Sequence, residues 1–230
     1  EFKALLKNNG FRLSAIGSPI GKTRIDHDFS LQLKRFERAI HLCKVFDTPN
    51  IRIFSYYPPG DCHDWNVVDE TWEKEVFDRM QRKIKLAEDN NLTLMHENEH
   101  RIYGDSPDRV NRLMNQVNSP RFRAVYDAAN YVFCGYDPWE GWIKSREYTA
   151  HFHIKDWKSG ESHGCLPGEG DGRWFEVLKD AIARNYQGFA TMEPHLLGGG
   201  PTGGLTGPDL FPKAVHFFEV LLKEAGGKRD

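Results

Sequence analysis

Segments with the apolar pattern of a β-strand alternate with longer segments of helical periodicity along the whole chain. The strand-like segments are residues 11–17, 51–56, 92–97, 121–127, 149–154 and 189–193. Apolar residues recur every three or four positions in residues 29–46, 70–88, 107–117, 174–188 and 209–225. This alternation predicts a parallel sheet, because a helix between two strands returns the chain to the end where the next parallel strand begins.

Eight such strand–helix units would close the sheet into a barrel. Six strands are visible, a strand before the helix-like residues 1–10 would make seven, and GCLPGEG (164–170) is the candidate for the eighth. We therefore expect an α/β fold, a (β/α)8 TIM barrel, which typically takes about 250 residues. Its first strand would precede residue 1. The alternative is a doubly wound open sheet, which normally carries a glycine-rich fingerprint after its first strand; none is present here.

Composition limits the number of domains that the chain can form and the kinds of partner that it can bind. No low-complexity linker interrupts residues 1–230, so we expect a single domain. The net charge of −2 argues against a nucleic-acid partner, since such proteins carry a basic surface. No apolar run approaches the ~18 residues of a membrane span. The four cysteines, Cys43, Cys62, Cys134 and Cys165, form no C-x-x-C pair. A cytoplasmic protein is expected on that basis, and a homo-oligomer remains open.

The letters of HENEH, residues 96–100, match the H-E-x-x-H pattern of zinc proteases. In a helix, His96 and His100 would share a face and bind one zinc ion. The preceding Leu-Thr-Leu-Met fits a buried strand instead, and the two asparagines before it break a helix. In a strand the two histidines would lie about 13 Å apart. We therefore interpret the segment as a strand, and the zinc protease is the weaker alternative.

Four predicted strands end in a residue that can bind a metal ion, namely Glu97, Asp127, His153 and Glu193. The strands of a TIM barrel end on one face, where its active sites lie. Three carboxylates and one imidazole suit one divalent ion. Mn²⁺ is our first choice, Mg²⁺ is the next, and Zn²⁺ or Co²⁺ remains open.

The segment HFHIKD, residues 151–156, places three polar side chains on one face of a strand. His153 is nearest the strand end and is the better ligand. His151 is expected one layer below, hydrogen-bonded inside the barrel. Lys155 either contacts a substrate oxygen or is a solvated loop lysine.

The chain resembles the xylose isomerase-like TIM-barrel superfamily, in particular the sugar phosphate isomerase/epimerase group that includes ketose 3-epimerases. The motifs that carry the resemblance are HEN, YDAAN, HFHIKD, GEGD and MEPH. The resemblance implies that Glu97, Asp127, His153 and Glu193 hold one divalent metal, and that both glutamates act as acid and base on a substrate carbon. Two positions depart from the ketose 3-epimerases, which have histidine at the position of Asn130 and arginine at that of Ser159.

The expected function is a metal-dependent sugar isomerase or epimerase that acts by proton transfer through an enediolate on a ketose or keto-cyclitol. The candidates for binding this small polyhydroxylated substrate are Asn130, Lys155, His195 and Trp65; core packing is the alternative for Trp65. The glycine-rich residues 196–209 are expected to bind a substrate phosphate or to form a lid. Three other functions stay open: a dehydratase of an inosose or keto-sugar, an abasic-site endonuclease, and a non-catalytic sugar-binding barrel. The net charge argues against the endonuclease.

Overall fold

The computed structural model describes residues 1–198 and 203–228. The strands are β1 (Ile16–Gly17), β2 (Asn50–Ile53), β3 (Thr93–Glu97), β4 (Phe122–Asp127), β5 (Thr149–Ile154), β6 (Asp156–Trp157), β7 (Gly164–Cys165) and β8 (Phe189–Met192). The α-helices are α1 (Phe2–Asn8), α2 (Phe29–Phe46), α3 (Glu70–Asp89), α4 (Pro107–Val117), α5 (Ala128–Phe133), α6 (Pro138–Ser145), α7 (Trp174–Ala183) and α8 (Phe211–Glu224). Two short 3₁₀ helices, Trp65–Val67 and Tyr103–Asp105, follow β2 and β3.

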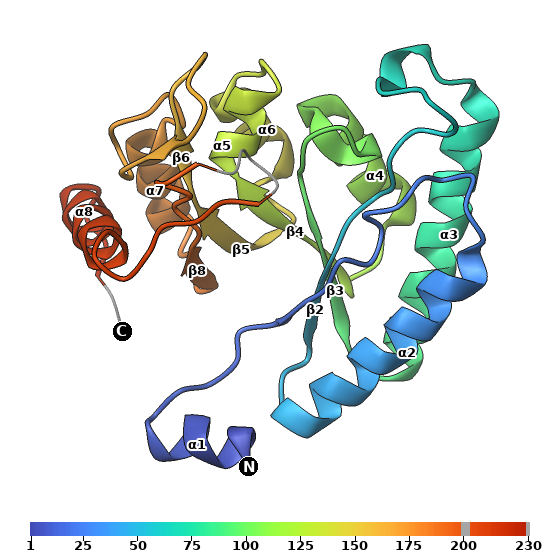
Figure 1. The fold of residues 1–230 in the computed structure, drawn as a ribbon, viewed down its shortest axis with the longest axis horizontal. Helices are drawn as coiled ribbons and strands as arrows, with labels where there is room; N and C mark the ends of the chain where they lie inside the picture. The colour runs from blue at the N-terminus through green and yellow to red at the C-terminus, as the bar shows by residue number, and fades with distance from the viewer. Residues whose placement is uncertain (199–202, 229–230) are drawn as a thin grey trace.

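Six strands form one parallel sheet in the order β1-β2-β3-β4-β5-β8. Neighbours in the sheet are also neighbours in sequence, apart from the step from β5 to β8. The helices from α2 onward pack outside it, whereas α1 buries no residue. This is the TIM-barrel arrangement that the strand–helix alternation predicts, with six of the eight strands. Figure 1 shows the open side, with β8 and α8 at one end of the sheet and β2 and α2 at the other.

The predicted eighth strand is wrong. Gly164 and Cys165 form β7, which pairs antiparallel with β6 in a separate two-stranded ribbon. Residues 158–172 therefore make an excursion above the barrel. Among the described residues, the hydrogen bonds of this excursion run within it, to Asp156 and Trp157, and to the His195 carbonyl after β8.

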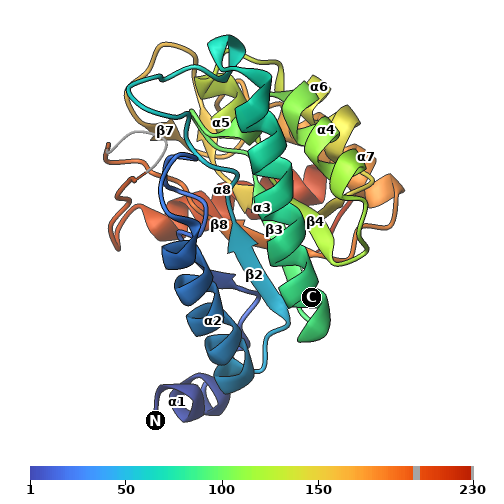
Figure 2. The ribbon, with the colours of Figure 1, turned by 90° about the vertical axis from the view of Figure 1, so that its right-hand side faces the viewer.

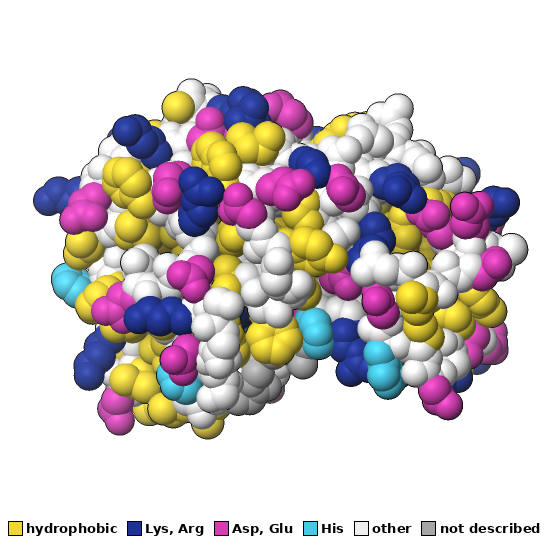
Figure 3. All heavy atoms as spheres, turned by 90° about the horizontal axis from the view of Figure 1, so that it is seen from above, with side chains coloured by type: hydrophobic (Ala, Val, Ile, Leu, Met, Phe, Trp, Pro, Cys, Tyr) yellow, Lys and Arg dark blue, Asp and Glu magenta, His cyan; other side chains and the backbone are white. Residues whose placement is uncertain are grey.

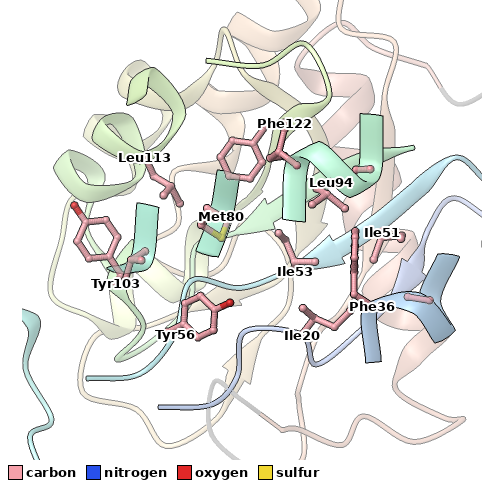
Figure 4. Close-up of a cluster of buried hydrophobic side chains, with 14 of the residues drawn as sticks. Ile20, Phe36, Ile51, Ile53, Tyr56, Met80, Leu94, Tyr103, Leu113 and Phe122 are labelled. Atoms are coloured by element: carbon pink, nitrogen blue, oxygen red, sulfur yellow. The ribbon is translucent and has the colours of Figure 1, made fainter. Parts of the chain in front are cut away.

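Two clusters of buried side chains lie between the sheet and its helices. In the first, Phe36 of α2, Met80 of α3 and Leu113 of α4 pack with Ile51 and Leu94 of the strands (Figure 4). The helices α2, α3 and α4 stand side by side over this cluster (Figure 2).

The second cluster lies between β4, β5 and the helices α5 to α8. The ring of Tyr126 contacts those of Trp142 and Trp174 edge-on, at centroid distances of 5.5 and 5.7 Å. Edge-to-face pairs of this kind add to the stabilisation that burial of the rings provides. The two clusters hold the strand ends in fixed relative positions, as a site assembled from several strands requires.

The helix starts agree with the sequence better than the ends. Asp28 caps α2 by accepting a hydrogen bond from the Ser30 N–H, and Ser106 caps α4 in the same way from Arg109. The predicted end of the helix at Gly188 is wrong, because α7 stops at Ala183 and the following residues form turns before β8. No helix in the described part of the chain is both long and apolar enough to cross a membrane.

Candidate metal centre

Glu97, Asp127, His153 and Glu193 converge at one end of the sheet. One ligand atom from each lies within 4.8 Å of those from the other three. Strand pairing explains the convergence. Asp127 is the register partner of His153, Glu97 ends the adjacent β3, and the Glu193 N–H donates to the Ile154 carbonyl of β5. Figure 3 views this end from above, where Asp/Glu, Lys/Arg and His side chains border a notch between the two halves of the molecule.

Neither histidine of HENEH belongs to this cluster. The segment Thr93–Glu97 is a strand, as predicted. His96 lies 2.8 Å through Nε2 from Ser55 Oγ, and burial lowers its pKa to about 3. His100 packs edge-on against Phe133 at 4.8 Å. The strand geometry therefore rules out the zinc-protease arrangement.

His153 stands between the two glutamates. Its Nδ1 lies 2.9 Å from Glu97 Oε1 and 2.9 Å from Glu193 Oε2. Burial alone would lower the pKa of His153, but the two carboxylates raise it to about 10. One Nδ1–H cannot point well at both oxygens. A divalent cation among these atoms would satisfy both carboxylates and leave His153 as a neutral ligand.

Asp127 lies at the buried base of the cluster. Its Oδ1 accepts a hydrogen bond from the Asn130 N–H at 3.0 Å and so caps α5. Lys155 Nζ lies 2.9 Å from Oδ2 as an ion pair. This oxygen nonetheless has no well-aligned hydrogen-bond donor among the described residues. Burial raises the pKa of Asp127, and Lys155 offsets part of that rise. A buried carboxylate oxygen with spare acceptor capacity fits a cation ligand, so the donor set as a whole fits a divalent metal.

Two asparagines lock the ends of β3 and β4 together. Asn98 accepts a hydrogen bond from the Asp127 N–H at 2.9 Å and donates one to the Asp127 carbonyl at 2.8 Å. Asn130 Nδ2 donates to the Asn98 carbonyl at 2.8 Å. Asn130 is thus buried beside a cluster member, where it supports the backbone.

Of the remaining residues predicted to bind substrate, some lie beside the metal cluster and one lies in the core. Lys155 is almost fully buried, so the solvated-lysine alternative is excluded. His195 Nε2 lies 3.2 Å from Glu193 Oε1. Trp65 packs in the first core cluster, with its ring edge-on to Tyr103 at 5.3 Å; this favours core packing. His151 is hydrogen-bonded to Thr191 Oγ1 at 2.7 Å, one layer below His153 as expected.

Sequence reasoning missed three charged residues around the cluster. Arg52 Nη1 lies 2.5 Å from Glu97 Oε2. Lys22 Nζ lies 2.8 Å from Glu99 Oε2, and Glu99 is itself buried. The only signal for Arg52 was a charged residue inside the apolar run IRIF. Its lumen-facing position could have been inferred from the alternation with Ile51 and Ile53.

Two loops flank this end of the barrel. Asp156 accepts hydrogen bonds from the N–H groups of Gly168, Gly170 and Gly172 at 2.8 to 3.1 Å, which explains the glycines of GEGDG. A Cβ at Gly170 would lie 2.3 Å from Asp156 Oδ1. In the glycine-rich loop, residues 199–202 lie outside the described residues, so the predicted phosphate contact falls partly there.

A cavity of about 810 Å³ lies away from the cluster, between α7, α8 and the open edge of β8. Apolar side chains such as Tyr186, Met192 and Phe218 line it, together with Arg12 and Glu219. None of the four clustered ligand residues reaches it. Because its lining lacks a comparable group of metal-binding side chains, we place the candidate site at the strand ends.

Comparisons with known proteins agree with this fold. Residues 1–218 match the family model described as xylose isomerase-like TIM barrel. The structure is similar to a D-tagatose 3-epimerase-like protein (15% identity, 98% of this chain and 82% of that chain, TM-score 0.78). It is also similar to a xylose isomerase-like TIM barrel protein from Mycobacterium smegmatis in complex with magnesium (17%, 97% and 76%, 0.73). A third similar structure is the probable 3-DHS dehydratase AsbF from Bacillus anthracis (18%, 84% and 73%, 0.70). No curated protein sequence matches the chain significantly.

Proposed function

We propose that this chain, which belongs to the xylose isomerase-like TIM-barrel family, is a divalent-metal-dependent isomerase or epimerase of a ketose or keto-cyclitol. The observation that carries the proposal is the convergence of Glu97, Asp127, His153 and Glu193 within 4.8 Å at the strand ends. Mn²⁺ is the first choice of metal, and the magnesium bound by a protein of similar fold supports Mg²⁺ as the second.

The four clustered residues would hold the ion through three carboxylate oxygens and one imidazole nitrogen. When bound, the ion would supply Lewis-acid stabilisation of the negative charge that develops on substrate oxygens. The protein would supply the proton transfer. A glutamate of the cluster would take a proton from the carbon beside the carbonyl and return it. Glu97 and Glu193 are the two candidates.

The surrounding residues would fix the orientation of these groups. Lys155 and the Asn130 N–H hold the Asp127 carboxylate from two sides, and Asn98 ties its backbone to β3. His195 contacts Glu193 and would bind a hydroxyl of the substrate beside it. Such preorganisation lowers the reorganisation that the reaction requires.

A dehydratase is the second candidate. Removal of the same proton can be followed by loss of a neighbouring hydroxyl as water, and a probable dehydratase is among the proteins of similar fold. The two candidates differ in their products and need no different metal site.

A screen of ketoses and keto-cyclitols with metal-stripped protein, with and without added Mn²⁺ or Mg²⁺, tests the proposal. We expect metal-dependent formation of an isomer or epimer of equal mass, identified by NMR after the protein and metal are removed. A product lighter by one water would establish the dehydratase. Absence of any product with a protein that binds the metal would contradict both enzymes and favour a sugar-binding barrel.

A further inference from the structure

On the basis of the proposed function, we infer that Glu193 alone transfers the proton, from one face of the substrate, and that Arg52 keeps Glu97 out of the transfer. This inference favours an isomerase over an epimerase. A single base on one face can move a proton between adjacent carbons, but it cannot invert a carbon, which requires a proton to leave one face and return to the other.

Both carboxylate oxygens of Glu97 are already engaged. Oε1 faces His153 Nδ1 at 2.9 Å, and Oε2 faces Arg52 Nη1 at 2.5 Å. The side chain of Glu97 is only 2% exposed. An arginine keeps its charge at all ordinary pH values and has no acceptor to give up. The Glu97 oxygen that does not face His153 is therefore held by a permanent cation rather than open to a substrate carbon.

Arg52 is itself held in place. In the register of β2 and β3 it stands beside Met95, two residues before Glu97 and therefore on the same face of the strand. Its guanidinium lies 4.5 Å from the centroid of the Phe54 ring. Lys22, which pairs with Glu99, lies 4.3 Å from the same ring. Phe54 and two cations thus enclose the Glu97 side of the cluster.

Glu193 is placed differently. Its side chain is 32% exposed, against 2% for Glu97. It follows β8, the edge strand of the sheet. Its side-chain contacts are with two histidines, His153 and His195, and the buried Lys155 also attracts it electrostatically. Glu193 is therefore the carboxylate of the cluster that a substrate can approach.

The reaction that follows is a 1,2-isomerisation between a ketose and an aldose. Glu193 takes a proton from C1 as the C1–H bond breaks and an enediolate forms between C1 and C2. While the proton is on the carboxyl group of Glu193, it exchanges with solvent. The same glutamate then gives a proton to C2 on the same face, and the hydroxyl proton on O1 moves to O2. No atom is lost and no oxidant is needed.

The accessibility of the two glutamates can be tested without a substrate. Metal-stripped protein is treated with a water-soluble carbodiimide and an amine, and the modified carboxylates are located by mass spectrometry. We expect modification of Glu193 and protection of Glu97. In Arg52→Met, Glu97 should become modified, whereas Arg52→Lys should keep it protected. Arg123→Met is the control, since the hydrogen bond of Arg123 in the described part of the chain goes to the Glu147 carbonyl at the opposite rim. Equal modification of both glutamates in the wild type would overturn the inference.

The stereochemistry of the reaction provides the second measurement. With the wild-type protein in D₂O, the deuterium in the product should appear at C2 in one configuration, and no product inverted at an exchanged carbon should form. Arg52→Met, once titration has established that it binds one metal ion per chain, should lose this single-face selectivity, and Arg123→Met should keep it. Inversion by the wild type would overturn the inference while leaving the proposed function intact. If Glu97 is protected from the carbodiimide but no substrate carbon takes up deuterium, the proposed function would be contradicted instead.

Discussion

Lys155 Nζ lies 2.9 Å from Asp127 Oδ2, and both side chains are buried. Removing one partner of a buried ion pair leaves an uncompensated charge, which typically costs about 3–5 kcal/mol. We expect Lys155→Met to lower the free energy of unfolding of the metal-free protein by this order. The double variant Lys155→Met/Asp127→Asn should recover most of the loss, as measured by urea unfolding. A single variant as stable as the wild type would show that the pair contributes nothing.

Asp127→Ala should abolish tight metal binding, because it removes one of the four ligand groups that converge among the described residues. The loss of affinity should exceed the roughly 10–100-fold that loss of a hydrogen-bonding partner behind a ligand usually costs. Calorimetric titration with Mn²⁺ measures it. Asp105→Ala is the matched control, since Asp105 is largely buried but pairs with Arg109 outside the cluster. Unchanged affinity in Asp127→Ala would remove this residue from the site.

Lys83 has a buried amine on α3, with no hydrogen-bond partner for Nζ among the described residues. Its contact is with the Tyr56 ring, 4.6 Å away. Burial lowers its pKa from 10.5 to about 7. Between these values the unfolded chain holds a proton that the folded chain does not, so the wild type loses stability as the pH falls from about 10.5 to 7.

Lys83→Met should therefore be more stable than the wild type at pH 7, and the advantage should shrink by about 1.4 kcal/mol per pH unit toward pH 10.5. Thermal unfolding at several pH values measures the difference. The control is Lys85→Met, an exposed position on the same helix, which should change stability little. If the advantage did not change with pH, Lys83 would hold its proton equally in the folded and unfolded chains, which would contradict the lowered pKa.

The sequence predicted the strand ends and helix starts because both are local. An apolar run followed by a polar residue marks where a strand leaves the sheet, as at Asp127, and a side chain such as Asp28 caps its own helix. Pairing between distant segments is not local. Residues 11–17 alternate as a strand should, yet only Ile16 and Gly17 pair with β2.

The same distinction applies to the candidate site. Its four metal-binding residues could be named because each ends a strand. The contact between Arg52 and Glu97 could not, because it depends on how β2 and β3 align, and this register is set by packing of the whole sheet. The ribbon formed by β6 and β7 could not be predicted from the sequence for a related reason. Asp156 organises it through backbone N–H groups that carry no side-chain signal.

Asp156→Ala should release the loop of residues 158–172. Three N–H groups would lose their acceptor, and the amides of Gly168, Gly170 and Gly172 should exchange with deuterium faster. Asp156→Asn keeps one acceptor oxygen, so its exchange rates should lie between those of the wild type and the alanine variant. Equal protection in all three proteins would show that other contacts hold the loop.

Proton exchange at carbon tests the central claim most directly. An active sugar is incubated in D₂O with the Mn²⁺-loaded wild type, Glu193→Gln, and the control Glu176→Gln, whose substitution lies on the exposed face of α7. We expect deuterium on a carbon of the former carbonyl–hydroxyl pair with the wild type and the control. With Glu193→Gln the rate should fall by about 10²–10⁴-fold, the usual contribution of a positioned acid–base group. Conversion of the sugar with no solvent deuterium in the product at any time would contradict the account, because the hydrogen would then move directly between carbons without a protein base.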